Sequence, residues 1–182
     1  NTQIVSYRNY LDSSSKFIGD NIMKSKMLLA IVTMLIAFAT NGYAENDGVA
    51  FPQGYRNWQH VKSMLIQPGH ALENPFQGIH HIYANDKAAI GLKAGTYADG
   101  SVLVFDLLNY IEKDKSIQEG ERKLVGVMHK DSAKYSATGG WGFEGFADNS
   151  QTKRLVKDGG KSCFGCHAPE KGKDHVFSAL RD

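Results

Sequence analysis

The pattern that dominates this sequence is Ser101-Val102-Leu103-Val104-Phe105-Asp106-Leu107-Leu108-Asn109-Tyr110-Ile111, a run rich in Val, Leu and Phe. Such a composition predicts a long β-strand. The charged residues 113–120 follow it and predict a hairpin loop. Residues 122–130 then predict a strand that returns beside the first one. The two strands together predict an antiparallel sheet.

Shorter patterns on both sides extend this sheet. Residues 79–84 predict a short strand. Residues 138–146 carry glycines among aromatic side chains, which predicts a strand close to a flat ligand or to another backbone. Asn85 predicts the N-terminal cap of a helix over residues 86–93, and Gly95 predicts its end.

Two segments allow more than one interpretation. Residues 54–66 place apolar side chains near one helical face, although residues 61–66 are also compatible with a strand. Residues 151–161 are polar and could be helical in part. The sequence therefore predicts an α+β fold, strand-dominated, in which an antiparallel β-sheet carries short helices and ends in a C-terminal cysteine-containing segment.

The N-terminal region predicts export. Met23 is followed by two lysines, by the apolar residues 27–39 and by the small residues Gly42 and Ala44, which is typical of a cleaved signal peptide over residues 23–44. A membrane anchor is the alternative, but the 13 apolar residues are fewer than the roughly 20 that a spanning helix needs. We expect residues 1–22 to be an upstream extension.

One domain is then expected over residues 45–182, and its charge is balanced. The whole chain holds 21 Lys and Arg against 19 Asp and Glu, and residues 1–44 hold four and two of these, which leaves 17 of each sign. A neutral domain gives no electrostatic reason to bind nucleic acid or an anionic membrane.

Both cysteines of the chain belong to the motif Cys163-Phe164-Gly165-Cys166-His167. This spacing is typical of covalent haem attachment, in which each thiol adds to one haem vinyl group and the histidine ligates the iron. The motif therefore predicts one covalently bound haem c per chain, held by Cys163 and Cys166, with His167 as the metal ligand.

Three other interpretations of the motif remain open. A thioredoxin-like redox pair would follow a parallel strand, and no such unit precedes Cys163 in the expected order. A zinc site would need a fourth ligand, for which His175 is available. A disulfide is usual in an oxidising compartment, but across two residues it constrains the unfolded chain little, and it leaves His167 unexplained.

The motif is one of six stretches that together carry a resemblance to a known family. In chain order they are residues 51–58, 99–104, 127–131, 138–144, 163–167 and 174–178. Together they resemble the cytochrome P-460 family, which includes the β-sheet cytochromes c′ (cytochrome c′-beta). The resemblance implies a homodimer of mostly antiparallel β fold. It also implies one haem per chain and a five-coordinate iron whose distal side is open to small molecules.

The resemblance also implies two distal residues. Relatives that oxidise hydroxylamine carry a crosslinking Lys directly after the Asp-Gly-x-Val-x-Val stretch, and in this chain that position is Phe105. The distal Arg of the family falls at His80 and its distal acidic residue near Gly126. Because cytochromes c′-beta cap the iron with Phe, Phe105 points to the c′-beta type, with Phe105 and His80 beside the cofactor.

Alternation gives these residues a second interpretation. Phe105 shares a strand face with Leu103, where an ordinary core role is common for Phe. His80 and His81 are adjacent and so face opposite ways, which allows at most one of them to face the haem. Met128 is a possible sixth ligand or a core residue. Trp141 and Phe143 are expected to pack against the porphyrin or the core, and Glu144 could face solvent.

The expected function is that of an exported, periplasmic c-type cytochrome that binds NO or a similar small diatomic ligand. Two alternatives belong to other classes: a haem oxidoreductase acting on hydroxylamine or NO with a redox partner, and a periplasmic electron carrier. No catalytic residue is predicted, and no membrane contact is expected after signal cleavage.

Overall fold

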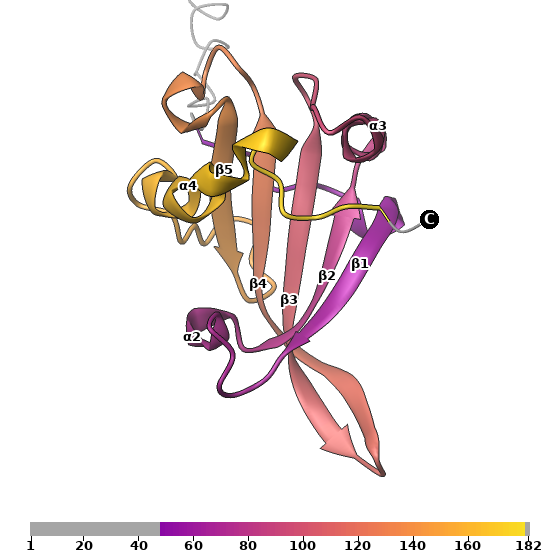
Figure 1. Ribbon diagram of the computed structural model, residues 1–182. Coiled ribbons are helices and arrows are strands. Elements are labelled where there is room, and N and C mark those ends of the chain that lie inside the picture. The colour runs from indigo at the N-terminus through magenta and orange to yellow at the C-terminus, as the bar shows by residue number, and fades with distance from the viewer. Residues whose placement is uncertain (1–47, 181–182) are drawn as a thin grey trace, which may run out of the picture. The chain divides into compact units, whose positions relative to one another are not determined.

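The computed structural model describes residues 48–180. Within this range, five antiparallel strands form one sheet in which each strand pairs with the next along the chain (Figure 1). The strands are β1 (Gln59–Ile66), β2 (Gly78–Ala84), β3 (Val102–Lys113), β4 (Ser116–Lys130) and β5 (Trp141–Ala147). The helical elements are η1 (Tyr55–Asn57), α2 (Glu73–Phe76), α3 (Asp86–Ala94), η2 (Ser136–Thr138), α4 (Lys161–His167) and η3 (Ala168–Lys173). The predicted strand-dominated α+β fold is confirmed.

The predicted hairpin is longer than its sequence pattern suggests. β3 and β4 stay paired as far as Lys113 opposite Ser116, and only Asp114 and Lys115 form the turn, with φ of 52° and 60°. Two consecutive positive φ values are what a two-residue hairpin turn requires. The loop predicted over residues 113–120 is therefore wrong, because the hairpin extends beyond the other strands (Figure 1), where charged side chains remain solvated.

β1 corrects the helical interpretation of residues 54–66. Only the single turn Tyr55–Asn57 is helical, and the strand alternative is confirmed for the rest. The pairing of β1 with β2 shifts between His60 and Lys62. Such a bulge displaces the alternation of buried residues by one position, so that over a short window it resembles a helical period.

The helix α3 forms where its capping residue predicts it. The Asn85 side chain accepts from the backbone N–H of Ala88 at 2.9 Å and of Val102 at 3.0 Å, so one amide caps α3 and ties it to β3. Gly95 ends the helix with φ 75°. The short helix is held by this cap and by the packing of its buried residues on the sheet.

One face of the sheet, which we call the N-terminal face, is closed by the beginning of the described chain. Val104, Val125 and Val127 lie on this face and are 0%, 1% and 2% exposed. They pack in one cluster with Val49 and Tyr55. This face is a conventional hydrophobic core.

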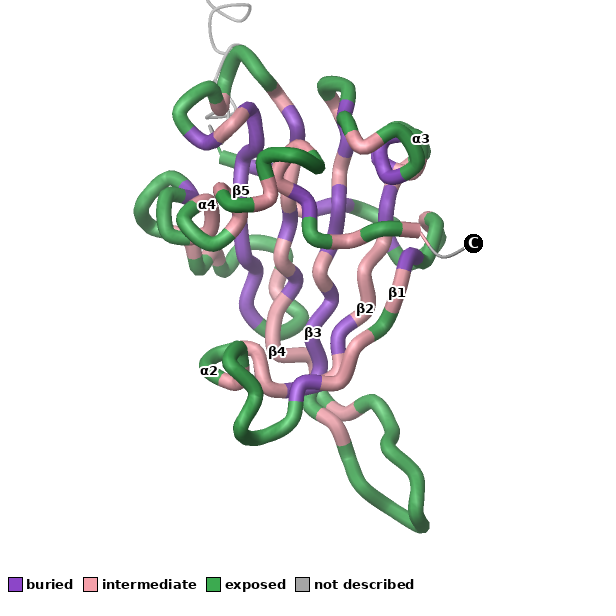
Figure 2. Tube along the Cα trace, in the orientation of Figure 1, coloured by how far each residue is buried: buried purple, intermediate pink, exposed green. Residues whose placement is uncertain are grey.

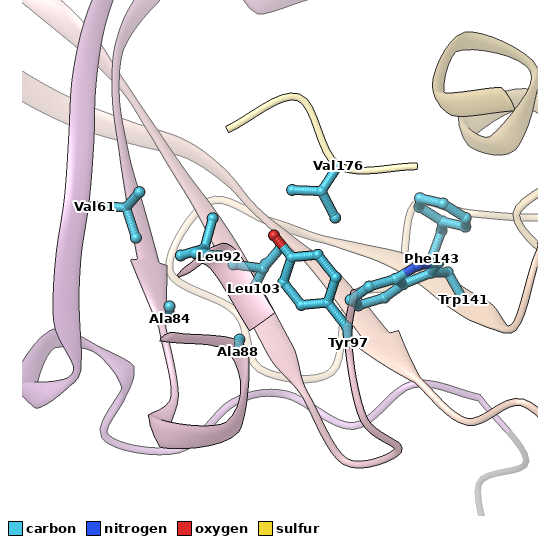
Figure 3. Packing of buried hydrophobic residues seen from close by; sticks show 9 residues of the cluster. All are labelled: Val61, Ala84, Ala88, Leu92, Tyr97, Leu103, Trp141, Phe143 and Val176. Atoms are coloured by element: carbon cyan, nitrogen blue, oxygen red, sulfur yellow. The ribbon is translucent and has the colours of Figure 1, made fainter. Parts of the chain in front are cut away.

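The opposite face, which we call the tail face, is covered in part by the C-terminal segment. Leu103, Trp141 and Phe143 are buried there, and Val176 of the returning tail packs onto them (Figure 3). The tail crosses the sheet from α4 toward β1 (Figure 1). This second cluster fixes the tail relative to the sheet.

Part of the tail face is less well covered. Four residues of the three inner strands β2, β3 and β4 are only half-buried, namely Ile82, Phe105, Gly126 and Met128. Figure 2 shows stretches of intermediate burial along these strands. The pairing register assigns these residues to the same face, with Phe105 opposite both Ile82 and Gly126. An apolar strip therefore remains accessible in the middle of the sheet.

In the range 48–180, no helix is long and apolar enough to cross a membrane. The predicted signal peptide (residues 23–44) and upstream extension (residues 1–22) lie outside the described residues.

Candidate functional site

The cysteine motif lies on the short helix α4. The Asp158 carboxylate accepts from the backbone N–H of Gly160 at 3.0 Å and of Ser162 at 2.8 Å, which fixes the first turn. Cys163 and Cys166 are three residues apart and so lie on one side of the helix. Both thiols are free. Cys163 is half-buried, and burial raises the pKa of its thiol, whereas Cys166 is exposed. Residues 151–160, which could have been helical in part, contain no helix.

His167 ends α4 with its imidazole oriented by the backbone. Its Nδ1 lies 2.8 Å from the carbonyl oxygen of His175. A carbonyl only accepts, so Nδ1 carries the proton and Nε2 keeps a lone pair for a metal. Burial lowers the pKa of His167, which favours the neutral form that a ligand needs. Its ring contacts Phe143 at 5.2 Å and Phe177 at 4.8 Å between centroids.

The chain after α4 turns sharply and so brings the His175 carbonyl back to His167. Asp174 and His175 have φ of 51° and 65°. The His175 ring packs on Phe164 at 5.0 Å, and it lies so close to Gly139 that an added Cβ there would come within 2.6 Å of it. In the described part of the chain, no group of three or more His, Cys, Asp and Glu side chains is arranged to hold a metal ion. His175 therefore does not complete the zinc site considered from the sequence.

Phe105 and His80 are in contact on the tail face. Their ring centroids are 4.5 Å apart, and His80 is 4% exposed. The Nδ1 atom of His80 is buried without a hydrogen-bond partner. Burial, followed by the charges of Lys62 and His81, lowers the pKa of His80 to about 4. His80 is therefore a neutral imidazole over most of the pH range.

His81 faces the other way, as alternation predicts. Its Nδ1 lies 2.6 Å from the Ser63 hydroxyl and its Nε2 lies 2.6 Å from the Glu119 carboxylate. Ser63 lies opposite His81 in the pairing of β1 with β2. Only one of the two adjacent histidines thus shares a face with Phe105.

Two neighbouring rows of the tail face connect the motif to Phe105. One row pairs Leu103, Met128 and Phe143, and His167 lies against its last member. The next row contains Phe105 and Gly126. Rows two residues apart on a strand are separated by roughly 7 Å. Met128 is half-buried and packs against the tail-face cluster, which agrees with its interpretation as a core residue.

Sequence reasoning missed Phe76. It lies on α2, and its ring meets that of Phe105 edge-on, with the two ring centroids 5.7 Å apart. The Lys123 ammonium donates to the carbonyls of Gln77 at 2.7 Å and of Pro75 at 3.2 Å, which holds this segment to the sheet. No local pattern indicates such a contact, because it depends on β4 passing beneath the segment.

Glu144 corrects another expectation. It does not face solvent but is 8% exposed and accepts from Arg154 at 2.8 Å and from the backbone N–H of Val156 at 3.1 Å. Alternation places it on the N-terminal face beside Val127. A buried carboxylate is tolerated there because a cation and backbone donors compensate it.

The sequence model of the cytochrome P460 family matches residues 52–178, a range that includes the whole sheet, the cysteine motif and the tail. The chain belongs to the cytochrome P460 family. No curated protein matches it significantly. Cytochromes P460 are haem c cytochromes and are typically periplasmic.

The residues of this cytochrome P460 fit a haem c. Two free thiols lie on one side of α4, and the tautomer of His167 leaves Nε2 available. The apolar strip around Phe105, Gly126 and Met128 offers a surface suited to a flat macrocycle. His80 adds an unpaired buried nitrogen to that surface.

Proposed function

We propose that this cytochrome P460 is an exported, periplasmic mono-haem c-type cytochrome of the c′-beta type that binds NO or a similar small diatomic ligand. Cys163 and Cys166 would hold the haem through thioether bonds, and His167 would ligate its iron. A bound haem c would supply an iron atom that can take up a small ligand. The observation that supports the proposal is the contact of Phe105 with His80 on the tail face, one row from the residue against which His167 lies.

The chemistry of these two side chains favours a neutral ligand. The Phe105 ring donates no hydrogen bond and excludes water. His80 is neutral at pH 7, since its pKa is lowered to about 4. A base with so low a pKa accepts protons poorly, whereas oxidation of hydroxylamine requires a proton acceptor. The position at which hydroxylamine-oxidising relatives carry a crosslinking Lys is Phe105 here. Binding is therefore a better match to the site than hydroxylamine oxidation.

The resemblance extends the proposal to processing and assembly. We expect removal of residues 23–44, so that the mature chain begins at Glu45, and we expect a homodimer. The intact mass of the exported protein tests the first expectation. A mass that includes residues 23–44 would indicate an anchor instead. Light scattering tests the second, and a monomer at all concentrations would contradict it.

Covalent attachment is tested with Cys163→Ser combined with Cys166→Ser. Acid-acetone treatment should leave haem with the wild-type polypeptide and remove all of it from the double variant, because no thioether bond remains. The single variants provide the control, since one bond should still retain haem. Haem that stays with the double variant under this treatment would overturn the assignment.

The distal site is tested with Phe105→Ala. Without the ring, water and ligands reach the iron more easily, so the on-rates of CO and NO should rise by about tenfold or more and the ferric spectrum should change. Phe51→Ala is the matched control, because Phe51 is also half-buried but packs on Phe146 at the N-terminal face. Stopped-flow mixing measures the rates.

The outcomes separate the candidate functions. Equal on-rates for Phe105→Ala and wild type would assign Phe105 to the core and reject the distal role. Efficient turnover of hydroxylamine by the wild type would reject the binding function in favour of an oxidoreductase. A wild-type spectrum with two strong protein ligands, unreactive to CO and NO, would favour an electron carrier.

A further inference from the structure

A partly buried ion pair connects the sheet to the tail at a point that haem attachment does not explain. Lys130 of β4 is 7% exposed, and its ammonium lies 2.6 Å from the Asp174 carboxylate and 3.1 Å from the Gly139 carbonyl. The same ammonium lies 5.1 Å above the Trp141 ring. We call Lys130, Trp141 and Asp174 the tail anchor.

Asp174 is fixed by both its side chain and its backbone. Its second carboxylate oxygen accepts from the backbone N–H of Tyr97 at 3.1 Å, and its backbone carbonyl accepts from the Trp141 indole N–H at 2.8 Å. Together with Lys130, these contacts reach Asp174 from the α3–β3 connection, from β4 and from β5. Figure 3 shows Tyr97 and Trp141 side by side below the tail.

The residue after Asp174 is the one that orients His167. The His175 carbonyl accepts from Nδ1 of His167 at 2.8 Å. Asp174 and His175 both have positive φ, which disfavours non-glycine residues by roughly 1 kcal/mol or more each. Such a conformation persists only when the surroundings impose it. The tail anchor acts directly on this backbone, together with the hydrogen bonds that the N–H groups of Asp174 and His175 donate to the carbonyls of Lys171 and Glu170.

Stability alone is a weak reason for this ion pair. Removing two charges from water costs about as much as their attraction returns, and an apolar pair of similar volume is often as stable. In some proteins, however, an ion pair specifies the position of its partners more narrowly than apolar packing does. That property matters where a backbone carbonyl must meet an imidazole within hydrogen-bond distance.

We propose that the tail anchor is a positioning device that holds the His175 carbonyl against His167 and thereby sets the electron density that the imidazole gives to the haem iron. The inference rests on the proposed function, in which His167 is the iron ligand. A strong Nδ1–H to carbonyl bond makes the imidazole more basic and stabilises ferric over ferrous iron. Weakening the anchor should lengthen this bond and shift the equilibrium toward ferrous iron.

Two substitutions weaken the anchor by different routes. Lys130→Met removes the ammonium and keeps an unbranched apolar stem over Trp141. Asp174→Asn removes the carboxylate charge and keeps a short side chain that tolerates positive φ. Lys173→Met is the matched control, because Lys173 is adjacent in sequence and its exposed ammonium pairs with the Glu170 carboxylate at 3.2 Å.

The measurements are made on the haem-loaded proteins. A tenfold shift of the equilibrium toward ferrous iron corresponds to a rise of about 59 mV in the midpoint potential. We expect a rise of this order in both anchor variants. The iron–histidine stretching frequency of the ferrous form should fall in resonance Raman spectra. The double variant should resemble the single ones, since both act on one hydrogen bond. Lys173→Met should match wild type in all readouts.

An unchanged potential and stretching frequency in Asp174→Asn would overturn the proposal and leave the anchor with a role in stability only. If Lys130→Met does not accumulate as a haem-loaded protein, the midpoint potential and the stretching frequency of Asp174→Asn alone test the proposal. Failure of the proposed function looks different: the wild type would then lack covalent haem or would show no iron–histidine stretch.

Discussion

The two faces of the sheet are built from the same strands but differ in how completely they are covered. Along β4, Val125, Gly126 and Val127 alternate between the faces. The two valines are 1% and 2% exposed on the N-terminal face, whereas Gly126 lies half-buried on the tail face. The N-terminal face is a fully covered hydrophobic core, whereas the tail face is covered only where the C-terminal segment crosses it.

Gly126 shows why the difference is informative. The three atoms nearest to a Cβ added at this position all belong to Phe105, the first at 3.4 Å, which is ordinary contact. The strand therefore does not require glycine here for space against the protein itself. Glycine in a strand interior weakens the strand and often marks the close approach of a ligand. The tail face thus has the properties of a surface that receives a flat group, and the N-terminal face does not.

The largest expected difference between the faces concerns two Phe-to-Ala substitutions. Phe146 is fully buried on the N-terminal face, and its truncation should lower the free energy of unfolding by about 3–5 kcal/mol. Phe105 is half-buried, so its truncation should lower that energy by only about 1–2 kcal/mol. Denaturant unfolding of the polypeptide expressed without haem attachment measures both.

Haem provides the check on this comparison. In the haem-loaded protein, the cost of Phe105→Ala should rise toward that of Phe146→Ala, because the haem would cover Phe105. The cost of Phe146→Ala should not change, since Phe146 faces away from the tail. Equal costs of the two substitutions in the haem-free polypeptide would show that the faces do not differ as the burial pattern indicates.

Much of the closed face and the attachment helix could be predicted from the sequence, because the signals are local. A run rich in Val, Leu and Phe identified β3, the Asn85 cap identified α3, and the cysteine spacing identified α4 as the attachment segment. The hairpin tip could not be predicted, because two non-glycine residues with positive φ form its turn. The bulge in β1 was missed for a related reason, since it changes the alternation on which the interpretation depends.

The site was predicted only where one short segment determines it. His167 follows from the motif, but the carbonyl that orients it comes from His175, and the tail anchor joins residues 44 positions apart in sequence. The contact of Phe76 with Phe105 likewise depends on how a segment folds over another strand. The opposite orientations of His80 and His81 were predictable, because they follow from alternation alone.

A smaller expected effect is a pH dependence of the free energy of unfolding, which should arise from His80 on the tail face. The pKa of His80 falls from 6.5 to about 4 on folding. Between these values the unfolded chain binds a proton that the native protein does not, so the stability contributed by His80 is fully present above pH 6.5 and is lost as the pH falls toward 4. At about 1.4 kcal/mol per pKa unit, the loss is roughly 3 kcal/mol.

His80→Leu removes the titrating group and should not show this loss. The measurement is the free energy of unfolding of both haem-loaded proteins at intervals from pH 7.5 to 4, compared as a difference so that other titrating groups cancel. A difference that stays constant over this range would mean that His80 is not held neutral by burial, and the apolar character of the tail face around Phe105 would lose its main electrostatic support.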